Sequence, residues 1–421
     1  MIVGEGTASD GRRLASAVGP VVGRPSLLRA INERLLLDAV RAGGPMSRAQ
    51  LVRVTGLSKP TVSLALSSLE DAGLVCVVGR SSGHVGAPAP LYAINSCAGW
   101  VVGVDLGRQW LRAAVADLTG QFRATCEEPN RSRSPASLVA HIGAIARRVA
   151  ADAEVPWAEV VRVVVGGPGV VDHDRHQVLL APSLPGWERR GLVDALRAQF
   201  DTPVEVDNDV NLAALGEQWA GLGPGVSHFI YLWVGTAIGL GIVVGGELLR
   251  GAHGLAGEIG YMTLSGRSTR GNGKRTRMLR QDVSAAATVR RARGLGLRGR
   301  VTAQKVFEAA RDGDEIAQAV VAGEAERIAL VIAAVAPVLD PELVLLGGGL
   351  AGNAELLQPV RKKLGQLSPF EPRVEISELG NRAVLHGAIA TALAASWEDL
   401  ARRAHTGTPR SKSRTDRAAQ S

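Results

Sequence analysis

Polar residues and glycines cluster at the ends of several apolar, strand-like stretches of this sequence. Asn208 and Asp209 directly follow the stretch VEVD, and a carboxylate beside an amide can bind the hydroxyl groups of a ligand. An Asn-Asp pair after a strand is also a common turn or helix cap, so the pair alone leaves both uses open. Glycine-rich turns at 235–239 and after the stretch LVLL at 343–346 offer backbone N–H groups that can approach a phosphate. Tight turns between strands and helices need small residues in any protein, so these glycines alone do not indicate nucleotide binding.

These turns belong to an alternation of strands and helices that begins near residue 100. Residues 100–118 predict a β-hairpin, in which two apolar strands flank the turn Asp105-Leu106-Gly107-Arg108-Gln109. Further strands are predicted within 163–172, 204–207 and 231–251, and residues 301–398 are mostly amphipathic helix. The pattern predicts an α/β domain over residues 99–398.

Three short helices are predicted before that domain. Apolar residues recur at helical spacing over 26–42, and Gly43-Gly44-Pro45 ends the first helix. Ser47 is the expected N-cap of a second helix at 48–54. Gly56 can adopt the positive φ that a sharp corner between helices needs. Ser58 then caps a third helix, which runs to about residue 72 with Pro60 in its first turn.

Two strands at 74–78 and 91–94, joined by a Gly/Ser/Pro-rich tip, follow the third helix and predict a wing. Together these elements predict a winged helix-turn-helix over residues 24–95, whose third helix enters the major groove of DNA. A module that serves only for dimerisation is the alternative. The residues expected to contact DNA are Arg48, Ser58, Lys59, Pro60, Thr61, Ser63, Arg80 and His84.

The basic residues of the chain are concentrated in three segments. The net charge of +8 is unevenly distributed, with 10 basic against 6 acidic residues over 1–95, 11 against 1 over 267–300, and 6 against 1 over 402–421. The rest of the chain is acidic. Such local basic patches indicate a polyanionic partner such as DNA. Residues 1–23 and 399–421 read as a flexible arm and a basic disordered tail.

The sequence also excludes several classes of protein. It has neither an N-terminal secretion signal nor a run of 18 apolar residues, so we expect a cytoplasmic protein that does not enter membranes. The three cysteines, Cys76, Cys97 and Cys126, are odd in number and never spaced as CxxC. Neither a disulfide framework nor a cysteine zinc site is therefore expected.

Over residues 24–398 the sequence resembles the regulators of the ROK family (repressors, open reading frames and kinases). The stretch TGLSKPTVS at 55–63 and the motifs VVVGGPGVVD, APSLPGW and VEVDNDVNLAALGE occur in the family's order and spacing. The resemblance implies a winged helix-turn-helix followed by a two-lobed domain of the sugar kinase, Hsp70 and actin superfamily. In the kinases of the family, residues matching Asn208 and Asp209 bind sugar hydroxyls, and the aspartate acts as general base.

The sequence departs from the kinase pattern at several positions. Arg108 and Gln109 replace a Gly and a Thr of the turn that binds ATP phosphates, and Tyr261 replaces the His of the family's Glu-x-Gly-His motif. Arg280 and Ser183 replace further sugar-contacting residues. The family's zinc-binding cysteines are absent. In their place stands a run of six cations, read either as a solvated loop or as an anion contact: Arg267, Arg270, Lys274, Arg275, Arg277 and Arg280.

The resemblance implies a DNA-binding regulator of sugar-related genes, acting as a repressor in the form of a homodimer or homotetramer. We expect no catalytic residue, no cofactor and no metal. A small, sugar-like ligand is expected in the cleft at Asn208, Asp209, Glu258 and Tyr261, and its binding is expected to weaken the hold on operator DNA. A sugar kinase and a regulator without a ligand are the alternatives.

Overall fold

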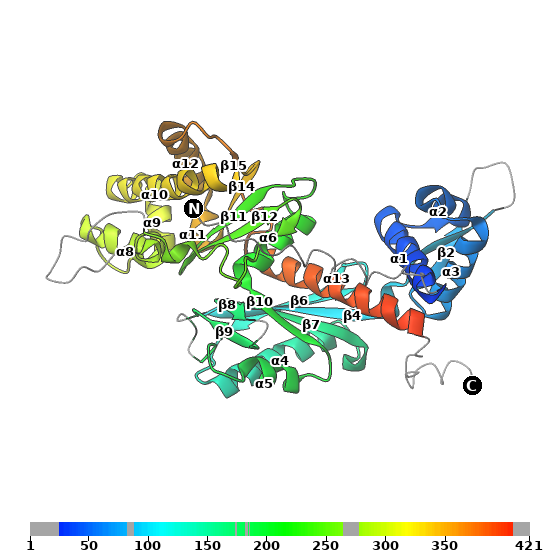
Figure 1. The fold of residues 1–421 in the computed structure, drawn as a ribbon. Coiled ribbons are helices and arrows are strands. Elements are labelled where there is room, and N and C mark those ends of the chain that lie inside the picture. The colour runs from blue at the N-terminus through cyan, green and yellow to red at the C-terminus, as the bar shows by residue number, and fades with distance from the viewer. Residues whose placement is uncertain are drawn as a thin grey trace, which may run out of the picture. The chain divides into compact units, whose positions relative to one another are not determined.

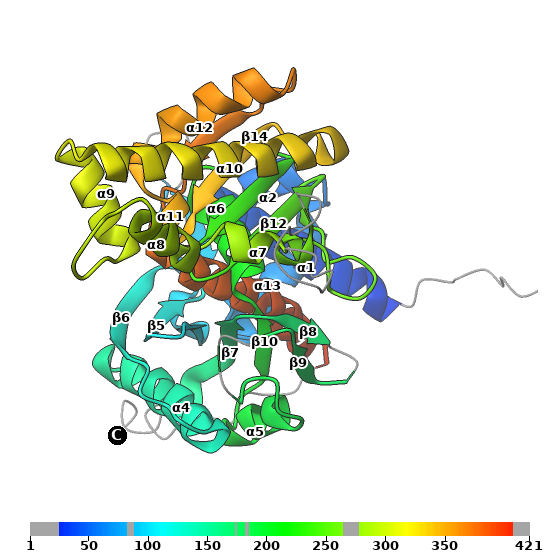
Figure 2. The same ribbon diagram turned by 90° about the vertical axis from the view of Figure 1, so that its left-hand side faces the viewer.

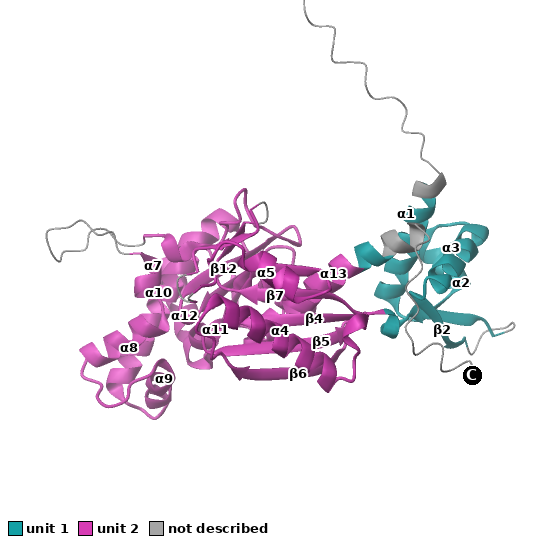
Figure 3. Ribbon diagram, turned by 90° about the horizontal axis from the view of Figure 1, so that it is seen from below, with its two compact units in different colours: residues 1–98, 397–421 teal, residues 99–396 magenta. Residues whose placement is uncertain are grey.

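The computed structural model describes residues 25–81, 88–172, 175–181, 184, 186–263 and 278–406. The chain forms two compact units, one of residues 1–98 with 397–421 and the other of residues 99–396 (Figure 3). Among the described residues, no helix is long and apolar enough to cross a membrane.

The first unit begins with three helices, α1 (Pro25–Gly43), α2 (Arg48–Thr55) and α3 (Lys59–Asp71). Ser47 and Gln50 form a reciprocal capping box at the start of α2, and the Ser58 side chain accepts a hydrogen bond from the Thr61 N–H at the start of α3. Gly56 has a φ of 70° and turns the chain between them, as its position in the sequence predicts. The three predicted helices are therefore present, each within two residues of its expected ends.

A small antiparallel sheet completes this unit. It consists of β1 (Met46–Ser47), β2 (Val75–Arg80) and β3 (Pro90–Ile94) in the order β1-β3-β2. β2 and β3 are the predicted wing strands, whereas the two-residue β1 was not expected. The core consists mainly of Leu36, Leu37, Val40, Leu51, Val62, Leu66, Leu69 and Tyr92.

The second unit contains two five-stranded sheets of matching topology (Figures 1 and 2). The first has the order β10-β7-β4-β5-β6, and the second has the order β13-β12-β11-β14-β15. In each sheet three antiparallel neighbours are extended by two parallel strands. The strands of the first sheet are β4 (Trp100–Leu106), β5 (Trp110–Asp117), β6 (Phe122–Pro129), β7 (Val160–Gly167) and β10 (Val204–Asn208). Those of the second are β11 (Phe229–Val234), β12 (Ile238–Val244), β13 (Glu247–Leu248), β14 (Leu343–Gly347) and β15 (Arg373–Ile376).

Helices cover the outer faces of both sheets. α4 (Pro135–Asp152) and α5 (Leu192–Gln199) pack on the first sheet, and α10 (Glu315–Leu339) and α12 (Ala354–Leu367) lie on the outer side of the second (Figure 2). The second unit also contains the hairpin β8 (Val170–Asp172) and β9 (Gln177–Leu179). Its shorter helices are α7 (Leu279–Asp282), α8 (Ala285–Gly294), α9 (Ala303–Arg311) and α11 (Gly348–Ala351). Its 3-10 turns are η2 (Trp157–Glu159), η3 (Ile259–Tyr261) and η4 (Gly380–Arg382), and η1 (Ser96–Ala98) follows β3 in the first unit. This is the predicted α/β architecture with two lobes.

Two helices, α6 (Asp209–Ala220) and α13 (Ala383–Thr406), cross where glycines remove all side-chain bulk. A Cβ added at Gly387 would lie 1.7 Å from the Leu212 carbonyl oxygen, and one added at Gly216 would lie 2.1 Å from the Ala383 carbonyl oxygen. The two backbones are therefore in direct contact. Beside them, the buried Glu217 carboxylate accepts hydrogen bonds from Ser377 Oγ (2.5 Å) and the Leu379 N–H (3.1 Å), which joins α6 to the end of the second sheet.

We expect Gly387→Ala to lower the free energy of unfolding of the second unit by about 1–3 kcal/mol, because a methyl group must push the two helices apart. Gly294→Ala is the matched control. A Cβ at Gly294, near the end of α8, meets no atom within 4 Å, so this change should be neutral or stabilising by up to about 1 kcal/mol. Urea denaturation followed by tryptophan fluorescence measures both, and equal effects would contradict the close crossing.

Candidate functional site

A cavity of about 760 Å³ in the second unit brings together the four predicted ligand-binding residues. Asn208 and Asp209 reach it from the junction of β10 and α6, whereas Glu258 and Tyr261 reach it from the segment that follows β13. Its other polar lining residues include Arg108, Thr236, Arg280, Gln281, Ser284 and Arg290. The residues expected to bind a ligand are therefore neighbours, although the sequence separates them by about fifty positions.

Asn208 serves mainly as a structural cap. Its Oδ1 accepts hydrogen bonds from the backbone N–H groups of Val210 (2.9 Å) and Asn211 (3.0 Å) at the start of α6. Its Nδ2 donates to the Gly169 carbonyl (2.9 Å), in the loop of the GGPG motif. Asn208 therefore has the capping role that the sequence left open, and binding of a ligand through its second amide N–H stays a prediction.

Asp209 is the carboxyl group best placed to meet a ligand. Its Oδ1 accepts a hydrogen bond from the Val210 N–H (2.9 Å), and the carboxyl group also accepts one from its own backbone N–H. Burial, together with the negative charges of Asp105 and Glu258, raises the pKa of Asp209 from 3.8 to about 7. The group is therefore divided between its acid and its base forms at neutral pH.

Glu258 is the N-cap residue of η3 and Tyr261 is its last residue, and both line the cavity. Burial raises the pKa of Glu258 above its usual range. The guanidinium of Arg280 lies over the Tyr261 ring, 4.5 Å from its centroid, in a cation–π contact. The cavity lining thus contains two acidic residues, Asp209 and Glu258, together with an arginine at the position where the ROK resemblance implies a glutamate.

The β4–β5 turn is closed by its own backbone. The Gly107 N–H donates to the Trp110 carbonyl (2.9 Å), and Asn130 Nδ2 donates to the Gly107 carbonyl (3.0 Å). Asp105 at its start is held by Arg112 (3.2 Å), although burial still raises the pKa of Asp105 to about 6. Arg108, at the tip, is exposed and lines the cavity, whereas Gln109 does not line it.

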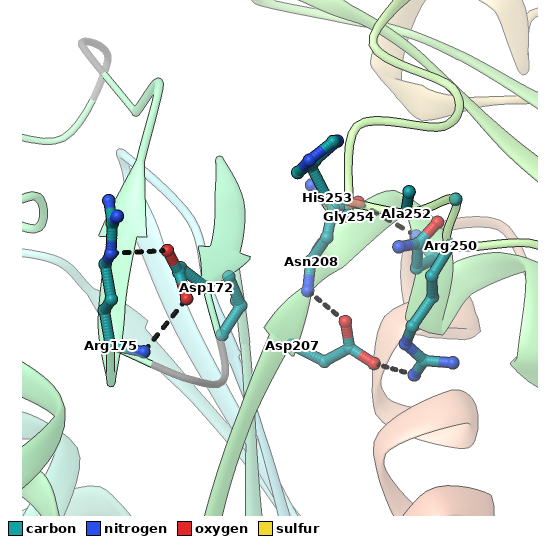
Figure 4. Close-up of a pocket in the computed structure, with 11 residues that line it drawn as sticks. Asp172, Arg175, Asp207, Asn208, Arg250, Ala252, His253 and Gly254 are labelled. Atoms are coloured by element: carbon teal, nitrogen blue, oxygen red, sulfur yellow. Dashed lines mark hydrogen bonds and ion pairs between the residues drawn. The ribbon is translucent and has the colours of Figure 1, made fainter.

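A second cavity, of about 380 Å³, lies on the other side of Asn208 (Figure 4). Two ion pairs line it, between Asp207 and Arg250 and between Asp172 and Arg175. Asn208, Asn211 and Gly254 line both cavities. Sequence reasoning missed this cavity, and the only signal for it was Asp207, the residue before the predicted Asn208.

The exposed face of α3 carries most of the residues predicted to contact DNA. Lys59 and Pro60 are exposed, and Thr61 and Ser63 are partly exposed. The hydroxyl groups of Ser58 and Thr61 hydrogen-bond to each other (2.8 Å), so they stabilise the start of the helix. Sequence reasoning missed Leu64, which is 60% exposed. Its helical spacing from Pro60 was the available signal, and an apolar side chain there can contact a thymine methyl group.

The remaining predicted DNA contacts are arginines and the wing tip. Arg48 is the first residue of α2, and its guanidinium lies 5.3 Å from the centroid of the Tyr92 ring in a cation–π contact. Arg80 Nη1 donates to the Pro88 carbonyl (3.5 Å) at the base of the wing. His84 and Ser183 lie outside the described residues. Of the six cations of the basic run, only Arg280 is among the described residues. Among described residues, no group of three His, Cys, Asp or Glu side chains is arranged to hold a metal ion.

Comparison with known proteins assigns the family. The sequence model of the ROK family matches residues 101–395, and that of the MarR family matches residues 30–84. The chain belongs to the ROK family. Because its ROK domain follows a MarR-type winged helix, the protein is a DNA-binding transcriptional regulator of that family.

ROK relatives of both functional types are similar to the chain. The xylose repressor of Caldicellulosiruptor bescii is 27% identical over 388 residues, which cover 88% of this chain and 97% of the repressor. The glucokinase of Halalkalibacterium halodurans is 31% identical over 313 residues, which cover 68% of this chain and 93% of the kinase.

Two solved structures extend the comparison. A ROK family glucokinase from Streptomyces griseus, in complex with glucose and AMPPNP, is 28% identical and superposes with a TM-score of 0.61 over 70% of this chain and 99% of the kinase. A ROK family transcriptional regulator described as a homologue of the E. coli MLC protein shares the fold, with a TM-score of 0.75, 21% identity and coverage of 90% of this chain and all of that regulator.

We expect Asp209→Asn to stabilise the ROK domain in a pH-dependent way. The pKa of Asp209 is about 7 in the folded protein and near 3.8 when unfolded, so the folded state binds more protons between these values and loses stability as the pH rises. Asparagine removes this loss. The gain should be absent below about pH 4 and reach roughly 1–3 kcal/mol above pH 7. Urea denaturation at pH 4 and pH 8 measures it, with the exposed Asp201→Asn as control; a gain independent of pH would contradict the assignment.

Proposed function

We propose that this protein is a cytoplasmic transcriptional repressor that holds operator DNA as a homodimer and releases it when a sugar-like ligand enters the cavity at Asp209. In this proposal α3 and the wing bind DNA, whereas Asn208, Asp209, Glu258 and Tyr261 bind the ligand. Two winged helices in a dimer read two half-sites, whose spacing must match the separation of the helices. A ligand that changes this separation changes operator affinity.

The observation that carries the proposal is the contrast between two residues that line the cavity. Asp209 offers a carboxyl group that can accept hydrogen bonds from hydroxyl groups. Arg108 occupies the tip of the β4–β5 turn. Phosphoryl transfer depends mainly on positioning the phosphates, and a long cationic side chain obstructs their close approach to the backbone of that turn. The cavity is therefore equipped to bind a ligand rather than to phosphorylate it.

A sugar kinase is the second candidate, and one observation favours it. The raised pKa of Asp209, about 7, is well matched to a general base that works at neutral pH. A glucokinase is also among the chain's similar relatives. A base alone contributes about 10²–10⁴-fold to a rate, so it does not by itself provide kinase activity.

We expect Lys59→Ala to weaken operator binding roughly tenfold at 0.1 M salt, since one phosphate contact is lost. The slope of log K against log salt concentration should fall by about 0.9. The DNA is a fragment recovered by genome-wide mapping of bound sites, and fluorescence anisotropy gives the affinity. Lys305→Ala, at an exposed position of α9 in the other unit, is the control. An unchanged salt slope in Lys59→Ala would contradict the proposed DNA-binding face.

We expect no sugar-dependent ATP turnover, and release of operator DNA by at least one member of a panel of hexoses, pentoses and amino sugars. Asp209→Ala should abolish that release by removing the acceptor of the ligand's hydroxyl groups, while Asp201→Ala, at an exposed loop position, should leave it intact. Coupled ATPase assays with magnesium measure turnover, and anisotropy measures release. Turnover that requires sugar and disappears in Asp209→Ala would establish the kinase instead.

A further inference from the structure

The charged lining of the ligand cavity is dominated by arginine. Its charged residues are the three cations Arg108, Arg280 and Arg290, against the two carboxyl groups of Asp209 and Glu258. Burial raises the pKa of both carboxyl groups, that of Asp209 to about 7, so Asp209 is partly protonated near neutral pH. The cavity is therefore positive, which is unusual for a site that would bind a neutral polyol through its hydroxyl groups alone.

Within the described part of the chain, none of these three arginines is paired with a carboxylate. Among the described residues, Arg108 makes no hydrogen bond or ion pair. Arg280 makes a cation–π contact with the Tyr261 ring, and Arg290 Nη2 donates to the Gln281 carbonyl (2.7 Å). Other arginines of the same unit are neutralised, for example Arg112 by Asp105 (3.2 Å) and Arg291 by Glu324 (2.9 Å). As far as the described residues show, the cavity arginines thus keep most of their donors for a ligand.

Two of the three cations stand where the ROK resemblance implies other residues. Arg108 occupies the position of a glycine and Arg280 that of a glutamate, so both differences shift the charge of the cavity in the same direction. They come from opposite sides, Arg108 from the β4–β5 turn of the first sheet and Arg280 from α7 beside the second. An oxyanion between them would be attracted by both lobes at once.

We propose that the effector of this regulator is an anionic carbohydrate, whose hydroxyl groups meet Asp209 and Glu258 and whose phosphate or carboxylate is bound by Arg108 and Arg280. The inference rests on the proposed function, since it names the class of ligand for the same cavity. Guanidinium groups bind phosphate and carboxylate through paired, charge-assisted hydrogen bonds. Binding from both lobes would also connect the ligand's charge to lobe closure.

The test compares matched ligands on the full-length protein. Isothermal titration calorimetry is run with glucose, mannose and N-acetylglucosamine, with the 6-phosphate of each, and with glucuronate. Inorganic phosphate alone, at equal ionic strength, tests the anion without the sugar. At least one charged ligand should bind about tenfold or more tightly than its neutral parent, a difference of 1.4 kcal/mol. A preference for the phosphates over glucuronate, or the reverse, identifies the anionic group.

The variants Arg108→Gln and Arg280→Gln should each reduce the ratio of charged to neutral affinity about tenfold. A ratio is used because partial misfolding would weaken both ligands and leave it unchanged. Arg298→Gln, at an exposed position outside the cavity, should keep the wild-type ratio. Circular dichroism checks the fold of each variant.

The outcomes separate this inference from the proposed function. Equal affinity for neutral and charged ligands, together with release of operator DNA by the neutral sugar, would overturn the anionic effector and leave the sugar-responsive repressor standing. A charge preference that survives in both arginine variants would likewise overturn it. If no carbohydrate bound and none released the DNA, both proposals would fall. Inorganic phosphate that bound as tightly as the sugar phosphates would show an anion site without carbohydrate recognition, and would also overturn the inference.

Discussion

The contact between the backbones of α6 and α13 determines where the candidate ligand-binding residues at the start of α6 lie in the ROK domain. Gly216 and Gly387 leave no space for a side chain at the crossing, so the two helices have one distance of closest approach. α6 carries Asn208 and Asp209 at its N-terminal end, and α13 packs on β4, where Ala388 and Ile389 lie close to Gly103. The position of the candidate ligand-binding carboxylate is therefore set by the crossing and by the first sheet together. A shift of either helix would move the carboxylate relative to Glu258 and Tyr261.

Buried carboxyl groups in this domain follow two different patterns. Glu217, fully buried, accepts hydrogen bonds from Ser377 Oγ and from the N–H groups of Leu379 and Leu222, so its oxygens are satisfied. Asp209 and Glu258 are less well supplied with donors, and burial raises the pKa of both. A carboxyl group that the protein satisfies stabilises the fold, whereas one left short of donors destabilises it until a ligand provides them. The second pattern is typical of functional sites.

Local sequence signals predicted the elements well where a single residue fixes the backbone. Ser47, Gly56 and Ser58 define the helix boundaries of the first unit because capping and positive φ depend on immediate neighbours. The apolar spacing of α1 was less informative, since Leu28, Ile31 and Leu35 are 44–55% exposed while Leu36, Leu37 and Val40 form the core. Periodicity shows that a helix has apolar faces but does not tell which face the domain covers. In the ROK domain, the resemblance selected the four candidate residues. The contact of Asn208 with Gly169 and the second cavity beside Asp207 depend on residues that are distant in sequence.

The cavity lined from both sheets suits the proposed regulator, which binds its ligand without phosphoryl transfer. A ligand can shift operator affinity only by the difference between its affinities for the two arrangements of the protein, and typical couplings of 1–3 kcal/mol correspond to about 5–150-fold. An enzyme that modified the ligand would consume the signal that the regulator has to report. In a cavity whose donors and acceptors come from both sheets, such as Arg108 on one side and Glu258 on the other, bound ligand favours the arrangement in which these groups are close. If the ligand weakens operator binding as proposed, operator DNA must by linkage weaken ligand binding by the same factor.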